Sequence, residues 1–211
     1  DVKKLNKLYG KKVILADREM IEKESEKIVA EAEKKEIAVL IIGDVFGATT
    51  HIELFRLAKE KNVLVKTINN ASILTAVGIT GLELYKFGKT TSIPFFEEYL
   101  NLETPYLVLK ENQKFGLHTL MLLDLDPSKE RFMTVNDALQ ILEKIEEKKK
   151  EKAITKDTLF VGCARLGRID YLVKKGTLKE LKSFDFGKPP HCLIVPGKLH
   201  FMEEEVLELW N

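Results

Sequence analysis

The chain has 211 residues, 45% hydrophobic and 32% charged, a length that suits one large or two compact domains. Its 34 basic and 33 acidic side chains leave a net charge of +1, which argues against a protein that binds nucleic acid phosphates or an anionic membrane surface. No apolar run approaches the ~20 residues of a membrane helix, and no apolar signal segment follows the opening residues. Two cysteines, Cys163 and Cys192, are too few for a disulfide framework. We therefore expect a cytoplasmic protein with no membrane or nucleic-acid partner.

Short apolar runs rich in β-branched residues alternate with longer amphipathic stretches along the chain. This alternation predicts βαβ units around a mostly parallel sheet, and hence an α/β fold. The predicted strands, in chain order, are residues 12–15, 37–42, 63–68, 90–93, 117–123, 158–164 and 192–195. The predicted helices are residues 21–35, residues 51–61 and a helix that Thr134 and Asp137 open in the manner of a capping box.

A change of pattern between Ile93 and Pro105 marks the predicted domain boundary. A strand-like run ends at Pro94, and a polar, aromatic-rich stretch precedes the next series of strands and helices. We therefore predict two α/β domains, residues 1–94 and residues 95–211, with a cleft between them. Because open α/β sheets bind ligands beyond the carboxyl ends of their strands, functional residues are expected just after strands.

Small, polar or glycine residues follow the predicted strands at five places: residues 43–51, 69–73, 124–126, 164–167 and 196–200. In the first, Gly43 and Gly47 flank Asp44, and two threonines precede a helix. Glycines let a backbone approach a ligand closely, and a helix N-terminus offers N–H groups that lack helical partners. On composition alone, an ordinary turn between strand and helix is the simpler alternative.

Two charged pairs at strand ends are further candidates. Asp124 and Asp126 would lie on one face of a strand as a carboxylate pair, or would merely end that strand. Arg165 and Arg168 would bind an anionic group or lower the pKa of the adjacent Cys163 thiol, or would be surface arginines.

Several common active-site motifs are absent from the sequence. It contains no GxxxxGK[ST] phosphate loop, no GxGxxG dinucleotide fingerprint and no GxSxG nucleophile motif. The four histidines are far apart and lack HExxH spacing, so we predict no metal site.

Residues 43–51, Gly-Asp-Val-Phe-Gly-Ala-Thr-Thr-His, resemble the GDPxxATTH segment of the diphthine synthases, a family of methyltransferases in the tetrapyrrole-methylase-like superfamily. The resemblance continues in the same order through nearly the whole chain, over residues 72–82, 85–89, 117–124, 164–165 and 189–200. Agreement of several separate segments is a specific signal, whereas any one of them alone would be weak.

The resemblance implies two α/β domains, a homodimer and S-adenosylmethionine held in the cleft between the domains. It also implies the reaction: methyl transfer to the amino group of a modified histidine on translation elongation factor 2, a step of diphthamide biosynthesis. Carried over position by position, the cofactor-binding residues would be Asp44, Gly47, Ser72, Ile73, Leu123, Leu166 and His191.

The sequence departs from the family pattern in two places. Val45 follows the acid where the family usually has proline, which would leave the loop less rigid. The family also opens with a strand, a glycine-rich turn that touches the cofactor and a helix, and this sequence begins after them. We therefore expect the 211 residues by themselves to lack one wall of the pocket.

Methyl transfer from a sulfonium requires a neutral amine held close to the methyl group and exclusion of water, which fits a sequence without a triad or metal motif. The proton acceptor stays open among Asp124, His118 and bulk water. Two alternative functions also stay open: another methyltransferase of the superfamily, acting on precorrin or ribosomal RNA, and a non-catalytic binding module. The number of methyl groups transferred, and the formation of a methyl ester, are not fixed by the sequence.

Overall fold

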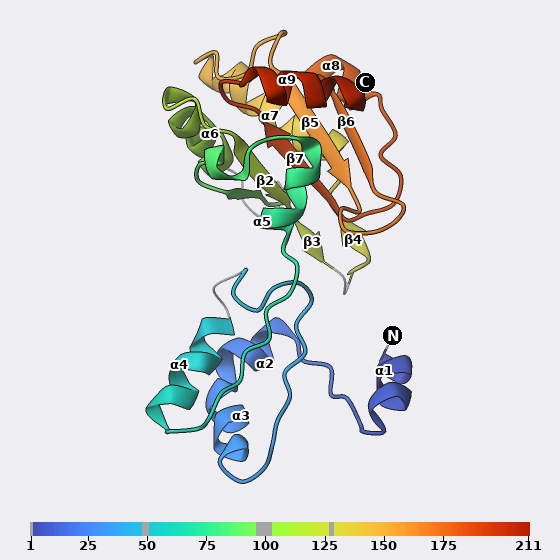
Figure 1. Ribbon diagram of the computed structural model, residues 1–211. Coiled ribbons are helices and arrows are strands. Elements are labelled where there is room, and N and C mark those ends of the chain that lie inside the picture. The colour runs from blue at the N-terminus through green and yellow to red at the C-terminus, as the bar shows by residue number, and fades with distance from the viewer. Residues whose placement is uncertain (1, 48–50, 96–102, 127–128) are drawn as a thin grey trace. The chain divides into compact units, whose positions relative to one another are not determined.

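The computed structural model describes residues 2–47, 51–95, 103–126 and 129–211 (Figure 1). The chain divides into two compact units, Asp1–Ser72 and Ile73–Asn211. The predicted boundary at residues 94 and 95 lies inside the second unit, and a two-domain division at that position stays a prediction. Among the described residues, every helix is too short or too polar to cross a lipid bilayer.

Helices build the described part of the first unit: α1 (Val2–Tyr9), α2 (Arg18–Lys23), α3 (Ser25–Ala32) and α4 (Ile52–Glu60). The Asp17 carboxylate accepts a hydrogen bond from the N–H of Met20 at 2.8 Å and caps α2. α3 packs on α4 through Val29, Leu57 and Ala58, which form the small core of this unit. The helix predicted over residues 51–61 is therefore confirmed, whereas the one predicted over residues 21–35 is two helices that meet at Glu24.

The three strands predicted in this unit are wrong. Residues 12–15, 37–42 and 63–68 lack regular secondary structure, and several of their apolar side chains, such as Ile42 and Leu64, are exposed. A strand needs a neighbour for its backbone hydrogen bonds, and the described residues of this unit contain no such strand. The apolar pattern of a segment does not reveal whether that neighbour is present.

A five-stranded sheet with the order β1-β2-β7-β5-β6 forms the centre of the second unit. Its strands are β1 (Thr91–Ile93), β2 (Thr119–Leu123), β5 (Leu159–Ala164), β6 (Leu172–Thr177) and β7 (His191–Val195). The predicted strands over residues 90–93, 117–123, 158–164 and 192–195 are confirmed. The sequence pattern missed β6, whose apolar residues are interrupted by Lys174 and Lys175. A short hairpin, β3 (Leu125–Asp126) with β4 (Arg131–Phe132), follows β2.

The prediction of a mostly parallel sheet is wrong. β1 and β2 are parallel, but β7 runs antiparallel to both β2 and β5, and β6 runs antiparallel to β5. The crossover from β2 to β5 does give two strands of the same direction, as the alternation of strand and helix patterns predicts. β7 then inserts between them, and the order of elements along the chain does not reveal that insertion.

Helices cover both faces of this sheet (Figure 1). The larger core lies on one face, under α6 (Thr104–Lys114), α7 (Val135–Lys149) and α8 (Leu178–Lys182). On the other face, α5 (Ile73–Ala76) and the 3-10 turn η2 (Val77–Thr80) pack over the sheet together with α9 (Phe201–Leu207) and η6 (Glu208–Trp210).

The capping box predicted at the start of α7 is confirmed. Thr134 Oγ1 accepts a hydrogen bond from the N–H of Asp137 at 3.2 Å, and the Asp137 carboxylate accepts one from the N–H of Thr134 at 2.9 Å. The two side chains thus satisfy backbone donors that the first helical turn leaves without partners.

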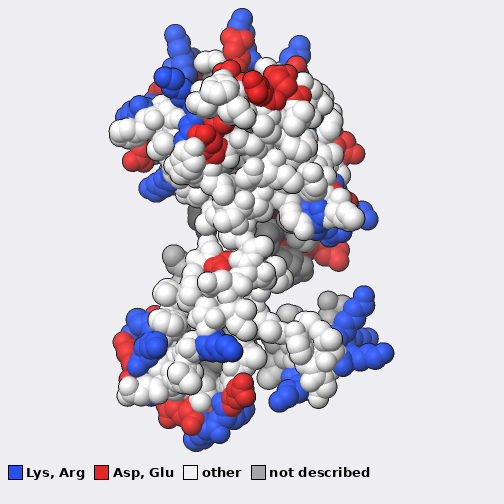
Figure 2. Space-filling view, viewed as in Figure 1, with Lys and Arg blue, Asp and Glu red and all other residues white. Residues whose placement is uncertain are grey.

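Charged side chains of both signs are interspersed over the face of the second unit that Figure 2 shows. Helix α1 differs, because it carries Lys3, Lys4 and Lys7 and no acidic residue. The near-zero net charge therefore coexists with a local basic patch on the first unit.

Candidate functional site

The Asp44 carboxylate joins two loops of the first unit. One oxygen accepts a hydrogen bond from the N–H of Asn70 and the other from the N–H of Phe46, each at 3.0 Å. These two hydrogen bonds lower the pKa of Asp44, so the carboxylate is ionised at neutral pH. A carboxylate has about four acceptor positions, so Asp44 keeps capacity to bind a donor group of a ligand.

Gly47 and Ser72 lie beside this contact. The N–H of Gly47 donates to the Asp44 carbonyl at 3.2 Å, and a Cβ added to Gly47 would lie 3.3 Å from Ser72 Oγ. The structure thus brings together three of the predicted cofactor-binding residues, Asp44, Gly47 and Ser72, within the first unit. Residues 48–50 of the same predicted loop lie outside the described residues.

His51, the last residue of the predicted loop, is a feature that sequence reasoning did not single out. Its Nδ1 is buried and has no hydrogen-bond partner among the described residues. A buried polar atom without a partner is rare, and a hydrogen bond from a further group, such as a ligand or water, would stabilise it.

Strand register places three other predicted residues at one end of the sheet in the second unit. β2 ends at Leu123, β7 begins at His191, and β5 ends at Ala164, two residues before Leu166. Leu122 pairs with Cys192 and Ala164 pairs with His191, so the three strand ends are adjacent. We call this part of the unit, residues 123–124, 164–166 and 190–191, the site end.

Residues of the site end point to both faces of the sheet. Leu123 belongs to the core under α7, and the His191 ring contacts the start of that helix. Leu166 packs instead against the core on the opposite face, where Ile73 also packs. The structure therefore brings Leu123 near His191, and places Ile73 and Leu166 on one shared cluster.

Backbone groups hold both nitrogens of the His191 ring. Nδ1 accepts a hydrogen bond from the N–H of Val135 at 3.4 Å, so Nε2 carries the proton and donates to the Lys188 carbonyl at 3.1 Å. Burial lowers the pKa of His191, which keeps the ring neutral. A contact from His191 to a ligand would therefore involve its main chain or ring carbons.

The two carboxylates at residues 124 and 126 do not act as a pair. The Asp124 carboxylate accepts hydrogen bonds from the N–H of Phe95 at 3.2 Å and of Leu125 at 2.9 Å. Asp126 forms an ion pair with Lys129 at 3.0 Å. Each carboxylate is thus used locally, Asp124 at the site end and Asp126 in the hairpin. Among the described residues, no three His, Cys, Asp or Glu side chains lie close enough to hold a metal ion.

The arginines do not lower the pKa of the Cys163 thiol. Cys163 faces Cys192 across β5 and β7, and both cysteines are buried as free thiols. A hydrogen bond to Cys192, together with burial, raises the pKa of Cys163. The predicted activated thiol is therefore wrong, because the guanidinium of Arg165 is turned toward backbone carbonyls and that of Arg168 toward Asp170.

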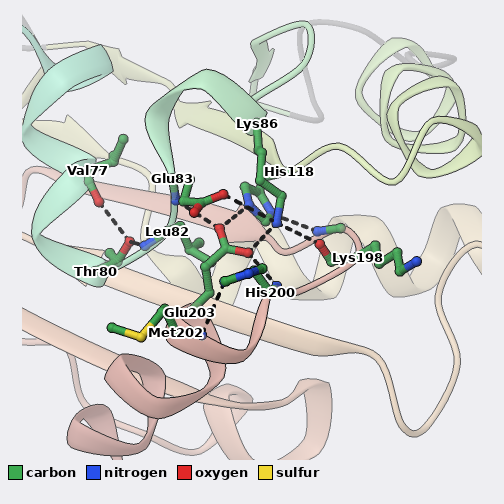
Figure 3. A network of polar contacts seen from close by, with 11 residues as sticks. Val77, Thr80, Leu82, Glu83, Lys86, His118, Lys198, His200, Met202 and Glu203 are labelled. Atoms are coloured by element: carbon green, nitrogen blue, oxygen red, sulfur yellow. Dashed lines mark hydrogen bonds and ion pairs between the residues drawn. The ribbon is translucent and has the colours of Figure 1, made fainter.

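A second group of polar contacts surrounds Glu203 at the start of α9 (Figure 3). Its carboxylate accepts hydrogen bonds from the N–H groups of Glu83 and His200 and from His118 Nε2, each at 2.8 Å, and forms an ion pair with the Lys86 ammonium. Burial alone would raise the pKa of Glu203, but these donors lower it to about 2.

His118 belongs to this network and not to the site end. Its Nδ1 accepts a hydrogen bond from the N–H of Gly197 at 2.9 Å, so the ring is neutral with the proton on Nε2. It precedes β2, whereas Leu123 is at the other end of that strand. The structure therefore does not support His118 as proton acceptor, and the segments 85–89, 117–118 and 196–200 serve a buried structural network.

A family model supplies the identification. The model described as tetrapyrrole (corrin/porphyrin) methylases matches residues 5–182. The chain belongs to the tetrapyrrole methylase family. The predicted superfamily, the predicted α/β fold and the predicted methyltransferase class are therefore confirmed, and methyltransferases of this family as a rule use S-adenosylmethionine.

Individual members of the tetrapyrrole methylase family match this chain over nearly its full length. The diphthine synthase of Methanocaldococcus jannaschii is 49% identical over 207 residues, which cover 97% of this chain and 80% of that protein. A probable diphthine methyl ester synthase of Arabidopsis thaliana is 44% identical over 223 residues, 98% of this chain and 80% of the relative. A crystal structure of diphthine synthase superposes with a TM-score of 0.89 at 35% identity, covering 100% of this chain and 80% of that one. The resemblance to diphthine synthases is confirmed, and these relatives do not favour methylation of precorrin or ribosomal RNA.

Proposed function

We propose that this protein is a diphthine synthase, which transfers methyl groups from S-adenosylmethionine to the amino group of the modified histidine of translation elongation factor 2 in diphthamide biosynthesis. The observation that carries the proposal is the likeness to a protein named diphthine synthase over 97% of this chain and 80% of that relative. The motif segments that resemble this family, distributed in order along the chain, support the same conclusion.

The residues present fit S-adenosylmethionine as the cofactor. Asp44 is ionised and keeps acceptor positions for hydroxyl or ammonium groups. Gly47 leaves space beside Ser72 that a Cβ would reduce, and His51 Nδ1 is a buried polar atom without a partner among the described residues. We therefore propose that Asp44, Gly47, Ser72, Ile73, Leu123, Leu166 and His191 hold the cofactor.

When bound, S-adenosylmethionine would supply a methyl group activated by its positively charged sulfur. The residues of this chain then have to bind the cofactor, orient the substrate amine and exclude water. No nucleophilic side chain or metal is needed for these tasks. Leu123, which is almost fully buried, and Leu166, which is partly buried, would make the surroundings of the cofactor apolar, and Asp44 would offer negative charge. Asp124 is the carboxylate of the site end, and we propose it as the acceptor of the proton that leaves the substrate amine.

The proposal includes a protein partner and an oligomeric state. Translation elongation factor 2 would be the substrate, and the enzyme would act in the cytoplasm as a homodimer without nucleic acid or membrane. The net charge of +1 supports the absence of nucleic-acid and membrane partners, because it provides little attraction to polyanionic surfaces. Sedimentation equilibrium would test the dimer directly.

A labelling experiment tests the proposed reaction. The protein is incubated with S-adenosylmethionine tritiated in the methyl group and with elongation factor 2 that carries the aminocarboxypropyl histidine. We expect tritium in this factor and none in a factor whose target histidine is replaced. Mass spectrometry of the product peptide counts the methyl groups and separates amine methylation from a methyl ester. Tritium in precorrin or RNA but never in the factor would refute the proposal.

A further inference from the structure

Arg165 lies where β5 leaves the sheet at the site end, and its backbone conformation is unusual. Its φ is +54°, in the left-handed region that residues with a side chain rarely adopt. Its N–H donates to the Pro190 carbonyl at 2.8 Å. Such conformations persist where the surrounding contacts determine them, and they are concentrated at ligand sites.

The guanidinium of Arg165 binds main-chain carbonyls of two other segments. Nε donates to the carbonyl of Asp170 at 3.0 Å, and Nη1 donates to the carbonyl of Phe186 at 2.9 Å and to that of Lys188. Nε also forms an ion pair with the Asp170 carboxylate at 3.1 Å, and the Arg165 side chain is only 10% exposed. A planar group with five fixed donors makes this multiple contact possible, whereas a lysine ammonium cannot span all of these acceptors.

The contacts of Arg165 and His191 meet at one atom. The Lys188 carbonyl accepts a hydrogen bond from Arg165 and another from His191 Nε2. Arg165 thus holds the segment 186–190 through its side chain and Pro190 through its own N–H. Leu166, the next residue along the chain, and His191, which follows Pro190 and begins β7, are both residues of the proposed cofactor site.

We propose that Arg165 is a positioning residue for the methyl donor. Arg165 fixes the segment 186–190 and thereby sets the position of the His191 main chain and of the Leu166 side chain. This inference rests on the proposed function, because it concerns the cofactor site of that reaction. Arg165 acts through these two residues and need not touch the reacting atoms.

Two variants of Arg165 test the proposal in the full-length chain. Arg165→Met keeps most of the side-chain volume and removes every donor, and Arg165→Lys keeps the charge but not the fork of donors. We expect Arg165→Met to raise the Kd for S-adenosylhomocysteine about tenfold by calorimetry, and to raise KM for S-adenosylmethionine while kcat stays within about twofold. The Kd and KM of Arg165→Lys should lie between those of Arg165→Met and those of the unchanged chain. Hydrogen exchange at the amides of residues 186–188 and 191 should be faster in both variants than in the unchanged chain.

Two control variants separate positioning from general stability. Arg168→Met removes an arginine that pairs with the same Asp170 but is 64% exposed, and it should leave the Kd unchanged. Lys86→Met breaks the ion pair with Glu203 at the other end of β2. It should lower the Tm and yet leave the Kd unchanged.

Each outcome decides between the proposals. A folded Arg165→Met protein with unchanged Kd overturns the positioning role, while the proposed function stands. If Arg165→Met does not fold, Arg165→Lys decides, and an unchanged Kd and KM in that variant would make Arg165 purely structural. If Lys86→Met loses as much affinity for S-adenosylhomocysteine as Arg165→Met does, the loss is explained by lower stability alone. That outcome would also overturn the positioning role of Arg165. If the unchanged chain binds no S-adenosylhomocysteine, the proposed function fails first, and the role of Arg165 fails with it.

Discussion

Asp44 is the side chain that connects the two loops of the first unit, and its charge can be tested separately from its size. Asp44→Asn carries one acceptor oxygen instead of two, so the N–H of either Phe46 or Asn70 loses its partner. The negative charge offered to the cofactor is lost as well. We expect the Kd for S-adenosylhomocysteine, measured by calorimetry, to rise about tenfold.

The matched control for this change is Asp17→Asn. It removes the same charge in the same unit, and asparagine caps a helix as well as aspartate does. Its affinity for S-adenosylhomocysteine should be unchanged. A folded Asp44→Asn protein that binds as tightly as the unchanged chain would place Asp44 outside the cofactor site.

Three titratable side chains make the stability of the second unit depend on pH. Burial lowers the pKa of His118 and of His191 from 6.5, and the donors around Glu203 overcome its burial and lower its pKa from 4.5 to about 2. In each case the folded state binds fewer protons than the unfolded chain, so stability that is present at neutral pH is lost as the pH falls. In denaturant titrations we expect the free energy of unfolding to decline below about pH 6.5 and more steeply below about pH 4.5.

Glu203→Gln tests whether Glu203 causes the steeper decline of the free energy of unfolding below about pH 4.5. The variant leaves the Lys86 ammonium with only the more distant Glu83 carboxylate, at 3.8 Å, and should cost about 3 kcal/mol at pH 7. It should also flatten the dependence of the free energy of unfolding between about pH 4.5 and pH 2, because the titrating group is gone. An equally steep decline in the variant would mean that other carboxylates are responsible.

At the scale of elements, the absence of a side chain at Gly162 lets the segment 186–190 pack on β5. A Cβ there would lie 2.3 Å from the Phe186 ring and 3.1 Å from the Val135 side chain. Phe186 is 1% exposed, so its ring cannot move aside without opening the core. We expect Gly162→Ala to lower the free energy of unfolding by about 2 kcal/mol and to weaken binding of S-adenosylhomocysteine.

Gly176→Ala is the control within the same sheet. Gly176 lies on β6 opposite Phe160, near the end of β5 that is remote from the site end, and an added Cβ would lie 3.1 Å from the Leu181 side chain. This variant should lose some stability and keep its affinity. If both variants bind S-adenosylhomocysteine equally, the packing of Phe186 on Gly162 does not influence the site.

At the scale of the whole molecule, the two units differ in the size of their cores. Among the described residues, the first unit buries a cluster of Val29, Leu57 and Ala58, whereas the second has a large cluster on each face of its sheet. Because burial of apolar surface is the main stabilising contribution, the first unit should open at a lower free energy. We expect amides of α3 and α4 to exchange with solvent hydrogen faster than those of β5 and β7. Equal protection in the two units would contradict this prediction.

The same exchange experiment with S-adenosylhomocysteine tests the predicted cleft between residues 1–94 and residues 95–211. Slower exchange at residues 43–47 and 69–72 together with residues 164–166 and 191 would mean that both predicted domains contribute to the site. Protection confined to one of the two would contradict the predicted cleft.

The sequence by itself determined which segments form the centre of the second unit and to which family the chain belongs. β1, β2, β5 and β7 were predictable because their side chains are mostly buried and therefore form apolar runs. The start of α7 was predictable because Thr134 and Asp137 cap it with local contacts. The positions of Leu123, Leu166 and His191 at or just after strand ends followed from the same patterns together with the family resemblance, whereas the strands predicted before Asp44 and Ser72 are wrong.

Only the tertiary structure decided which segments meet. It inserted β7 between β2 and β5, and it left the apolar runs at residues 12–15, 37–42 and 63–68 without strand partners among the described residues. It also joined His118 to Glu203, which are 85 positions apart, and directed Arg165 to the carbonyls of the segment 186–190. The physical reason is that a local pattern reports which side of a segment avoids water, whereas hydrogen bonds and ion pairs depend on distant segments that folding brings within about 3 Å.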